Sequence, residues 1–172
     1  MMRVSTFLVS LLLLSHLAPA AGAESLGPGM RLPDVVLVDQ HDVAGGIPPD
    51  TRLVLFTRDM DAASIVKEAL AEDGPALLGA AHAVCVADIE GMPAMITNLF
   101  ALPAMRKRPY RLLLDRNGTL TTAWPSMPEK VTVLRLQALV IEQVDYVDSP
   151  EALRAALGRS GEPTPLPTVP VQ

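Results

Sequence analysis

The stretch Leu53–Leu70 (LVLFTRDMDAASIVKEAL) decides the fold class, because an apolar run passes directly into a helical pattern. Leu53–Phe56 is the kind of continuous apolar run typical of a strand covered on both faces. Asp59 and Asp61 follow, and carboxylates are favoured where the amides at the start of a helix lack partners. Apolar residues then form one stripe at helical spacing: Ala62, Ile65, Val66, Ala69 and Leu70. The stretch predicts a buried strand and a packed helix, which Gly74-Pro75 is expected to end.

Strand and helix signals continue on both sides of this unit. We expect further strands at Val35–Val38, His82–Ile89, Tyr110–Leu114, Val131–Leu136 and Leu139–Val147. Asn117-Gly118 signals a tight turn. Ser149-Pro150-Glu151 begins a last helix, since Ser caps a helix and Pro fits its first turn. This order predicts an α/β domain in which a parallel part of a mixed sheet adjoins an antiparallel edge.

A second helix is expected to open at Pro93. Its apolar stripe consists of Met92, Met95, Ile96, Leu99 and Phe100, again three and four residues apart. That spacing is typical of a buried face, so we expect these side chains to pack in the core. A soft metal site or a binding groove is the alternative role for its methionines.

The two ends of the chain differ in composition from the rest. Arg3, the apolar run Phe7–Leu14 and the small residues Ala21-Gly22-Ala23 predict a cleavable signal peptide over residues 1–23. The apolar run is far shorter than the ~20 residues that span a bilayer, so no membrane-spanning segment is expected. Residues 24–159 are then expected to form one domain. Residues 160–172, which contain four prolines, are expected to form a disordered tail. The expected location is the periplasm or the extracellular space.

Net charge excludes one class of partner. The chain has 14 Lys and Arg against 19 Asp and Glu, and loss of Arg3 with the signal leaves 13 against 19, a net charge of −6. An acidic domain of this kind is not expected to bind nucleic acid.

Two segments outside the central unit carry a resemblance to a known superfamily. Leu32–Gln40 (LPDVVLVDQ), followed by Leu53–Phe56 and an acid-opened helix, resembles the start of peroxiredoxin-like and other exported thioredoxin-fold proteins. Pro109–Gly118 (PYRLLLDRNG) is similar to the proline, strand and turn that follow the second helix in that superfamily. The resemblance covers Gly29–Leu157 and implies a thioredoxin-like fold, a central mixed β-sheet flanked by helices.

The resemblance also implies a Cys-x-x-Cys at the start of the first helix, which this chain lacks. Asp61-Ala62-Ala63-Ser64 stands there, and Cys85 is the only cysteine, so no dithiol–disulfide cycle can run within the chain. The superfamily's cis-proline would fall on Pro109. Cys85 lies between two valines of an expected strand and is predicted to be buried. The alternative is an exposed thiol that forms a mixed disulfide with a partner.

Signatures of other enzyme classes are absent from the sequence. His41 and His82 are the only histidines after the predicted signal, and neither has recognised metal-ligand spacing. No Gly-x-Ser-x-Gly elbow, Gly-x-Gly-x-x-Gly turn or Walker loop is present. We therefore expect no metal and no cofactor, and catalysis is not the favoured interpretation.

A run of basic residues beside Pro109 is unusual in an acidic chain: Arg106, Lys107, Arg108, Arg111 and Arg116. If the fold is thioredoxin-like, this run borders the helix start that carries Asp59 and Asp61. It is either a solvated loop partly paired with those acids or an interaction surface for an anionic partner or a protein loop. The candidate interaction surface comprises Arg58, Asp59, Asp61, Ser64, Arg106, Lys107, Arg108, Pro109 and Arg111.

Together these features predict a non-catalytic, thioredoxin-like binding module of the cell envelope, whose partner is an envelope protein or an anionic ligand. One alternative is a thiol oxidoreductase or peroxidase-like enzyme that uses Cys85 with an external resolving thiol. A structural envelope protein without a small ligand is a third possibility that the sequence does not separate from the first.

Overall fold

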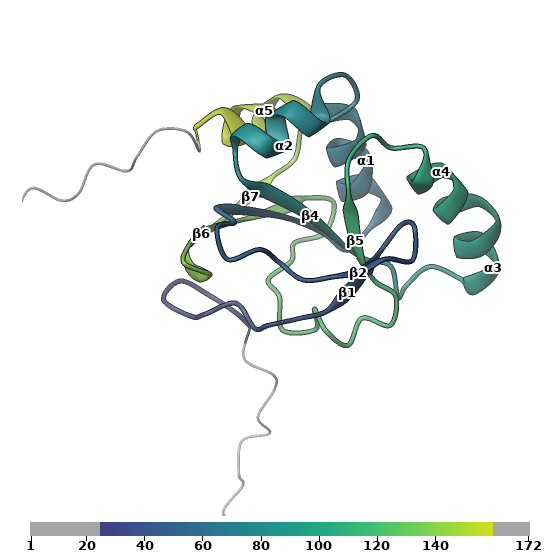
Figure 1. Cartoon of the computed structure of the whole chain (residues 1–172), viewed down its shortest axis with the longest axis horizontal. Helices are drawn as coiled ribbons and strands as arrows, with labels where there is room; N and C mark the ends of the chain where they lie inside the picture. The colour runs from purple at the N-terminus through teal and green to yellow at the C-terminus, as the bar shows by residue number, and fades with distance from the viewer. Residues whose placement is uncertain (1–24, 160–172) are drawn as a thin grey trace, which may run out of the picture.

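The computed structural model of the chain describes residues 25–159. The predicted signal peptide and the predicted tail lie outside these described residues. Between them runs one seven-stranded mixed sheet with helices packed against it (Figure 1). The expected α/β class is confirmed.

The sheet has the strand order β2-β1-β5-β4-β3-β6-β7. Its strands are β1 (Leu37–Asp39), β2 (Ala44–Gly45), β3 (Leu53–Thr57), β4 (Ala83–Asp88), β5 (Leu112–Asp115), β6 (Val131–Gln137) and β7 (Val140–Val147). β3, β4 and β5 run parallel, whereas β1 pairs antiparallel with β5 and β6 antiparallel with β3 and β7. The expected parallel part and antiparallel edge are both present.

The helices are α1 (Met60–Ala69), α2 (Gly74–Ala80), α3 (Ala94–Ile96), the π-helix η1 (Thr97–Ala101), α4 (Leu102–Arg106) and α5 (Pro150–Gly158). Asp59 caps α1 by accepting a hydrogen bond from the Ala62 amide at 2.8 Å, and Ser149 caps α5. The prediction that Gly74-Pro75 ends the first helix is wrong. α1 ends at Ala69, and Gly74-Pro75 begins α2, because a proline in a first turn lacks only an amide that has no helical partner there.

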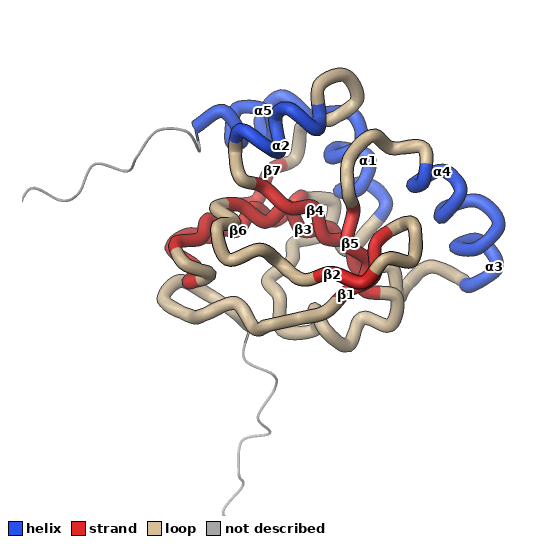
Figure 2. Tube along the Cα trace, viewed as in Figure 1, coloured by secondary structure: helices blue, strands red, loops and turns tan. Residues whose placement is uncertain are grey.

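One face of the sheet is covered by helices and the other by loops, as Figure 2 shows. The helix-covered core contains residues of α1, α2, α4 and α5 packed on Leu55, Cys85 and Leu114. The opposite core contains no helical residue, and loop residues such as Leu32 and Trp124 close it. The crossovers β3–β4 and β4–β5 advance in the same direction, and right-handed crossovers of that kind place their helices on one face.

The position of β5 corrects the implication that the superfamily's cis-proline falls on Pro109, beside the start of the first helix. β5 lies between β4 and β1, while β3, which leads into α1, has β4 and β6 as its neighbours. The segment after Pro109 is therefore two strands away from β3, and no peptide bond of the described residues is cis. The short local motif did not reveal this, because strand pairing depends on contacts distant in sequence.

α3, η1 and α4 form one continuous helical segment, residues 94–106, here called the α3–α4 segment. Its middle is a π turn, in which the Leu102 amide donates to the Thr97 carbonyl. Pro103 follows and cannot donate the usual hydrogen bond to Leu99, which explains why the helix widens there.

The apolar stripe of this segment is not in the core, so that prediction is wrong. Met95 is 72% exposed, Leu99 62%, Phe100 68% and Ile96 48%. Helical spacing shows that residues share a face but not that anything covers it. The segment is instead anchored by Thr97, Leu102 and Met105, and part of its stripe stands over a cavity.

Candidate functional site

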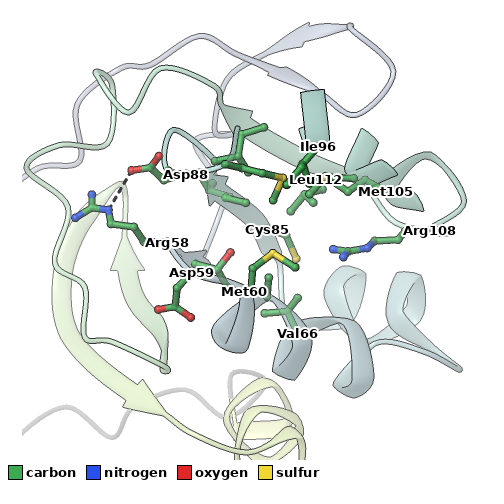
Figure 3. A pocket seen from close by; sticks show the side chains of 18 of the residues that line it. Arg58, Asp59, Met60, Val66, Cys85, Asp88, Ile96, Met105, Arg108 and Leu112 are labelled. Atoms are coloured by element: carbon green, nitrogen blue, oxygen red, sulfur yellow. Dashed lines mark hydrogen bonds and ion pairs between the residues drawn. The ribbon is translucent and has the colours of Figure 1, made fainter. Parts of the chain in front are cut away.

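A cavity of about 680 Å³ lies between α1 and the α3–α4 segment, over the carboxyl ends of β3 and β4 (Figure 3). Its floor and walls come from three strands and two helical segments: Leu55, Cys85, Ala87 and Leu112 below, Ala63 and Val66 on α1, and Ile96, Phe100 and Met105 opposite. The carboxyl edge of parallel strands is where open α/β sheets bind ligands, and this volume suits a small molecule.

The rim of the cavity is apolar and exposed. Met60 on α1 is 65% exposed, and Ile96 and Phe100 on the α3–α4 segment line the cavity as well. Large apolar side chains gathered at one opening are characteristic of an interaction site. The sequence singled out the stripe but favoured core packing over the binding groove, and the exposed fractions favour the groove.

Cys85 is buried at the floor of this cavity, as predicted, with 1% of its surface exposed. Burial raises the pKa of its thiol to about 12, although the cation of Arg108 opposes that shift. The thiol is therefore protonated at neutral pH. A protonated, covered sulfur is a poor nucleophile, because the thiolate is the reactive form.

The residues at the start of α1 carry no redox chemistry and only partly face the cavity. Asp59 lines it, but its carboxylate accepts hydrogen bonds from the backbone amides of Ala62 and Glu129, at 2.8 and 3.0 Å. Asp61 and Ser64 are exposed and do not line it, and the Ser64 hydroxyl donates to the Met60 carbonyl at 2.8 Å.

The structure divides the basic run instead of gathering it at α1. Arg106 binds Asp42 at 2.8 Å, Arg111 binds Asp39 at 3.0 Å, and Arg116 also binds Asp42. These partners lie at the end of β1 and in the β1–β2 turn, not at the start of α1 as expected. The reason is topological, since β5 lies beside β1 and carries the run there.

The acids of that turn are held in their charged forms. Burial raises the pKa of Asp39, but hydrogen bonds from the Val43 and His41 amides and from Arg111 outweigh burial and keep the pKa below its ordinary value. The hydrogen bond from Arg116 lowers the pKa of Asp42. Arg106, Arg111 and Arg116 are thus held in ion pairs with Asp39 and Asp42.

Arg108 is the member of the run that lines the cavity. It is half-buried, and no carboxylate of the described residues forms an ion pair with it. Lys107 is exposed and lines neither this cavity nor a second one of about 430 Å³. Pro109 and Arg111 lie at that second cavity.

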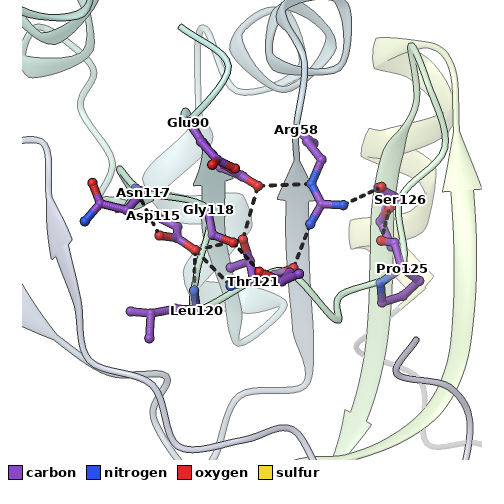
Figure 4. A network of polar contacts seen from close by, with 12 residues as sticks. Arg58, Glu90, Asp115, Asn117, Gly118, Leu120, Thr121, Pro125 and Ser126 are labelled. Atoms are coloured by element: carbon purple, nitrogen blue, oxygen red, sulfur yellow. Dashed lines mark hydrogen bonds and ion pairs between the residues drawn. The ribbon is translucent and has the colours of Figure 1, made fainter. Parts of the chain in front are cut away.

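Arg58 also lines the main cavity, but a polar network holds it (Figure 4). Its Nε contacts Asp88 at 3.0 Å, its Nη2 donates to the Thr121 carbonyl at 2.6 Å, and its Nη1 donates to Ser126 at 3.0 Å. Asp115 accepts from the hydroxyl and the amide of Thr121 at 3.0 and 2.8 Å. The network joins the ends of β3, β4 and β5 to the loop that follows β5.

Sequence reasoning found Arg58 but missed Asp88, Asp115 and Thr121. The sequence carried a signal for the two acids, because each stands at the end of an apolar strand run: Asp88 ends VCVAD and Asp115 ends LLLD. The carboxyl ends of neighbouring parallel strands lie at the same edge of a sheet, so the acids that end β4 and β5 are expected to lie close together, and the two are paired in the sheet register.

The described part of the chain, residues 25–159, holds no group of three or more His, Cys, Asp and Glu side chains that could bind a metal ion. It also has no helix with the length and apolar character needed to cross a bilayer. His82 faces Asp50, with 3.3 Å between Nδ1 and Oδ2.

No protein-family model matches the sequence, and no curated protein matches it either. Solved structures do resemble it. The peroxidoxin BcpB from Mycobacterium tuberculosis is 15% identical with a TM-score of 0.53, covering 80% of this chain and 99% of its own. A putative thiol:disulfide interchange protein DsbE from Chlorobium tepidum is 14% identical with a TM-score of 0.54, over 79% and 96%. A thio-disulfide isomerase from Thermus thermophilus is 14% identical with a TM-score of 0.51, over 81% and 100%.

These similarities confirm the thioredoxin-like fold that the sequence resemblance implied. At such low identity they show the fold alone.

Proposed function

We propose that this chain is a redox-inactive thioredoxin-like module of the cell envelope that acts by binding a ligand in the cavity between α1 and the α3–α4 segment. The observation that carries the proposal is the cavity of about 680 Å³ with the exposed side chains of Met60, Ile96 and Phe100 at its rim. Removal of apolar surface from water is favourable in free energy, and a ligand that fills the cavity would cover these exposed apolar side chains.

The absence of a redox pair supports binding over electron transfer. The solved structures with this fold include proteins described as a peroxidoxin and a thiol:disulfide interchange protein. Thiol exchange needs a reactive thiolate, and Asp61 and Ser64 stand where the resemblance implies the two cysteines. The scaffold is retained here without the atoms that would carry that chemistry.

An enzyme that uses Cys85 with an external resolving thiol is less well supported. Its sulfur would have to be both ionised and reachable, whereas burial raises the Cys85 pKa to about 12 and leaves 1% of the residue exposed. We therefore assign Cys85 to the cavity floor and not to catalysis.

The envelope location rests on the signal peptide predicted for residues 1–23. Expression with the native leader should deliver protein to the periplasmic or culture fraction with Glu24 as its first residue. Recovery of the uncleaved chain in the cytoplasm would contradict this part of the proposal.

The binding function is tested with the neutral apolar probe N-phenyl-1-naphthylamine, whose fluorescence rises in apolar surroundings. We expect saturable binding to the purified protein and its loss in Ala63→Trp, because an indole at this position fills the cavity from α1. Ser64→Trp is the matched control, since its neighbouring side chain is exposed and outside the cavity. Ala101→Trp fills the cavity from the opposite wall.

Each result bears on the proposal. Probe binding that neither cavity-filling variant reduces would refute the cavity as the binding site, provided that both variants keep the wild-type circular dichroism. Turnover in insulin reduction or peroxide reduction would refute redox inactivity.

A further inference from the structure

The charges that line the cavity are not equivalent. Arg58 is bound to Asp88 and to two further oxygens, and the Asp59 carboxylate accepts two backbone hydrogen bonds. Arg108 is the remaining charged side chain of the lining, and none of the ion pairs among the described residues includes it. The cavity thus presents one cation whose charge the described residues leave unpaired.

The titratable groups on which the Arg108 cation acts do not neutralise it. Its cation acts on the Cys85 thiol and the Tyr110 phenol. Burial raises the pKa of both, so both are uncharged at neutral pH. Arg108 lies at the cavity, with Cys85 and Met105 close by (Figure 3).

We infer that the cavity takes a small amphipathic anion, whose apolar body fills the space between α1 and the α3–α4 segment and whose carboxylate binds the Arg108 guanidinium. This inference rests on the proposed function. A guanidinium donates two parallel hydrogen bonds to a carboxylate, a geometry that an alcohol or an amine does not reproduce. The rest of the lining, from Leu55 on the floor to Phe100 at the rim, is mainly apolar and suits a hydrocarbon or aromatic body.

The shape of the site favours a small molecule over a protein segment. The cavity extends down to Leu55, Cys85 and Leu112, whose exposed fractions are 1–3%, so it enters the core and does not follow the surface. An extended peptide would also need partners for its own amides and carbonyls. All three other charged groups of the lining already have partners, because Arg58 binds Asp88 and the Asp59 carboxylate accepts from the Ala62 amide.

The experiment compares three ligands with one decyl chain and different head groups, each displacing N-phenyl-1-naphthylamine below its micelle concentration. These are decanoate, decanol and decyltrimethylammonium. We expect decanoate to bind about 10- to 100-fold more tightly than decanol, the range for a charge-assisted hydrogen bond in a partly buried site. The cation should bind most weakly, because it meets the guanidinium with like charge.

Variants assign the preference to Arg108. In Arg108→Gln the decanoate affinity should fall to that of decanol, and Arg108→Lys should keep part of the preference, since it retains the charge without the fork. Lys107→Gln is the matched control, because it removes the same charge one residue away and outside the cavity. Its decanoate preference should stay at the wild-type value.

The outcomes separate this inference from the function on which it rests. Equal binding of decanoate and decanol, or an Arg108→Gln variant that retains the preference, would overturn the anion assignment and leave the binding function standing. Loss of the preference in Lys107→Gln would also overturn it, since a general charge effect would then explain the selectivity. No binding of the probe or of any decyl compound would overturn the binding function itself.

Discussion

Gln40 is a buried amide that joins β1 to β5, and its replacement by methionine should destabilise the fold. Its side-chain Nε2 donates to the Tyr110 carbonyl at 2.7 Å, and its Oε1 accepts from the Leu112 amide at 2.9 Å. Gln40 is 1% exposed, so water does not replace these partners. Gln40→Met keeps the length of the side chain but removes both hydrogen bonds.

The expected loss follows from the two backbone groups left without partners. A buried donor or acceptor without a partner costs about 1–3 kcal/mol, so the two together should lower the free energy of unfolding by about 2–6 kcal/mol. Domains of this size are stable by about 5–15 kcal/mol, so the effect is large. Gln40 also holds the loop that carries Arg108. On the near side of Arg108, the Arg106 Nε donates to the Gln40 carbonyl at 2.8 Å, and on the far side the Tyr110 carbonyl accepts from the Gln40 side chain.

Urea unfolding followed by circular dichroism measures this change, with Gln137→Met as the control at an exposed glutamine. The control should differ from the wild type by no more than about 0.5 kcal/mol. A difference below about 0.5 kcal/mol between the two variants, with equal slopes in urea, would refute the reasoning. Faster hydrogen exchange at the Leu112 amide in Gln40→Met would identify the lost bond directly.

Three further predictions concern the thiol, pH and the exposed helix. With a pKa of about 12, Cys85 is about 10⁻⁴ thiolate at pH 8, so 5,5′-dithiobis(2-nitrobenzoate) should react only after urea unfolds the protein; stoichiometric reaction within minutes under native conditions would contradict this. The pKa of Asp73 is lowered by two hydrogen bonds from Arg154 at 2.8 and 3.0 Å, so the stabilisation by this ion pair is present above the ordinary Asp pKa of about 4 and is lost as the pH falls below it. The melting temperatures of the wild type and Asp73→Asn should therefore converge between pH 6 and 3. A gap in melting temperature that stays constant over this range would count against the pair. Met95→Gln with Leu99→Gln should change the free energy of unfolding by no more than about 0.5 kcal/mol, because both side chains are mostly exposed; a loss above about 1 kcal/mol in thermal or urea unfolding would show that they pack in solution.

The candidate site could be predicted from the sequence in parts. Arg108 and the Met95–Phe100 stripe both stood out, the first as charge in an acidic chain and the second as an apolar helix face. Their relation could not be read from the sequence. The stripe was assigned to the core and Arg108 to a surface shared with Asp61, whereas Arg108 and part of the stripe line one cavity.

The sequence by itself determined most of the local elements of this protein. Leu53–Phe56 is a strand and Asp59 caps the following helix because apolar runs, caps and turns act through neighbours in the chain. Cys85 was expected to be buried for the same reason.

Only the tertiary structure decided which elements lie side by side and which faces stay open. β5 pairs with β4 and β1, which carries Arg106 and Arg111 to the β1–β2 turn and leaves Arg108 at the cavity. The periodicity of an amphipathic helix is the same whether its apolar face packs on a core or lines a cavity. What covers a face depends on contacts between residues far apart in the chain, and no local pattern records them.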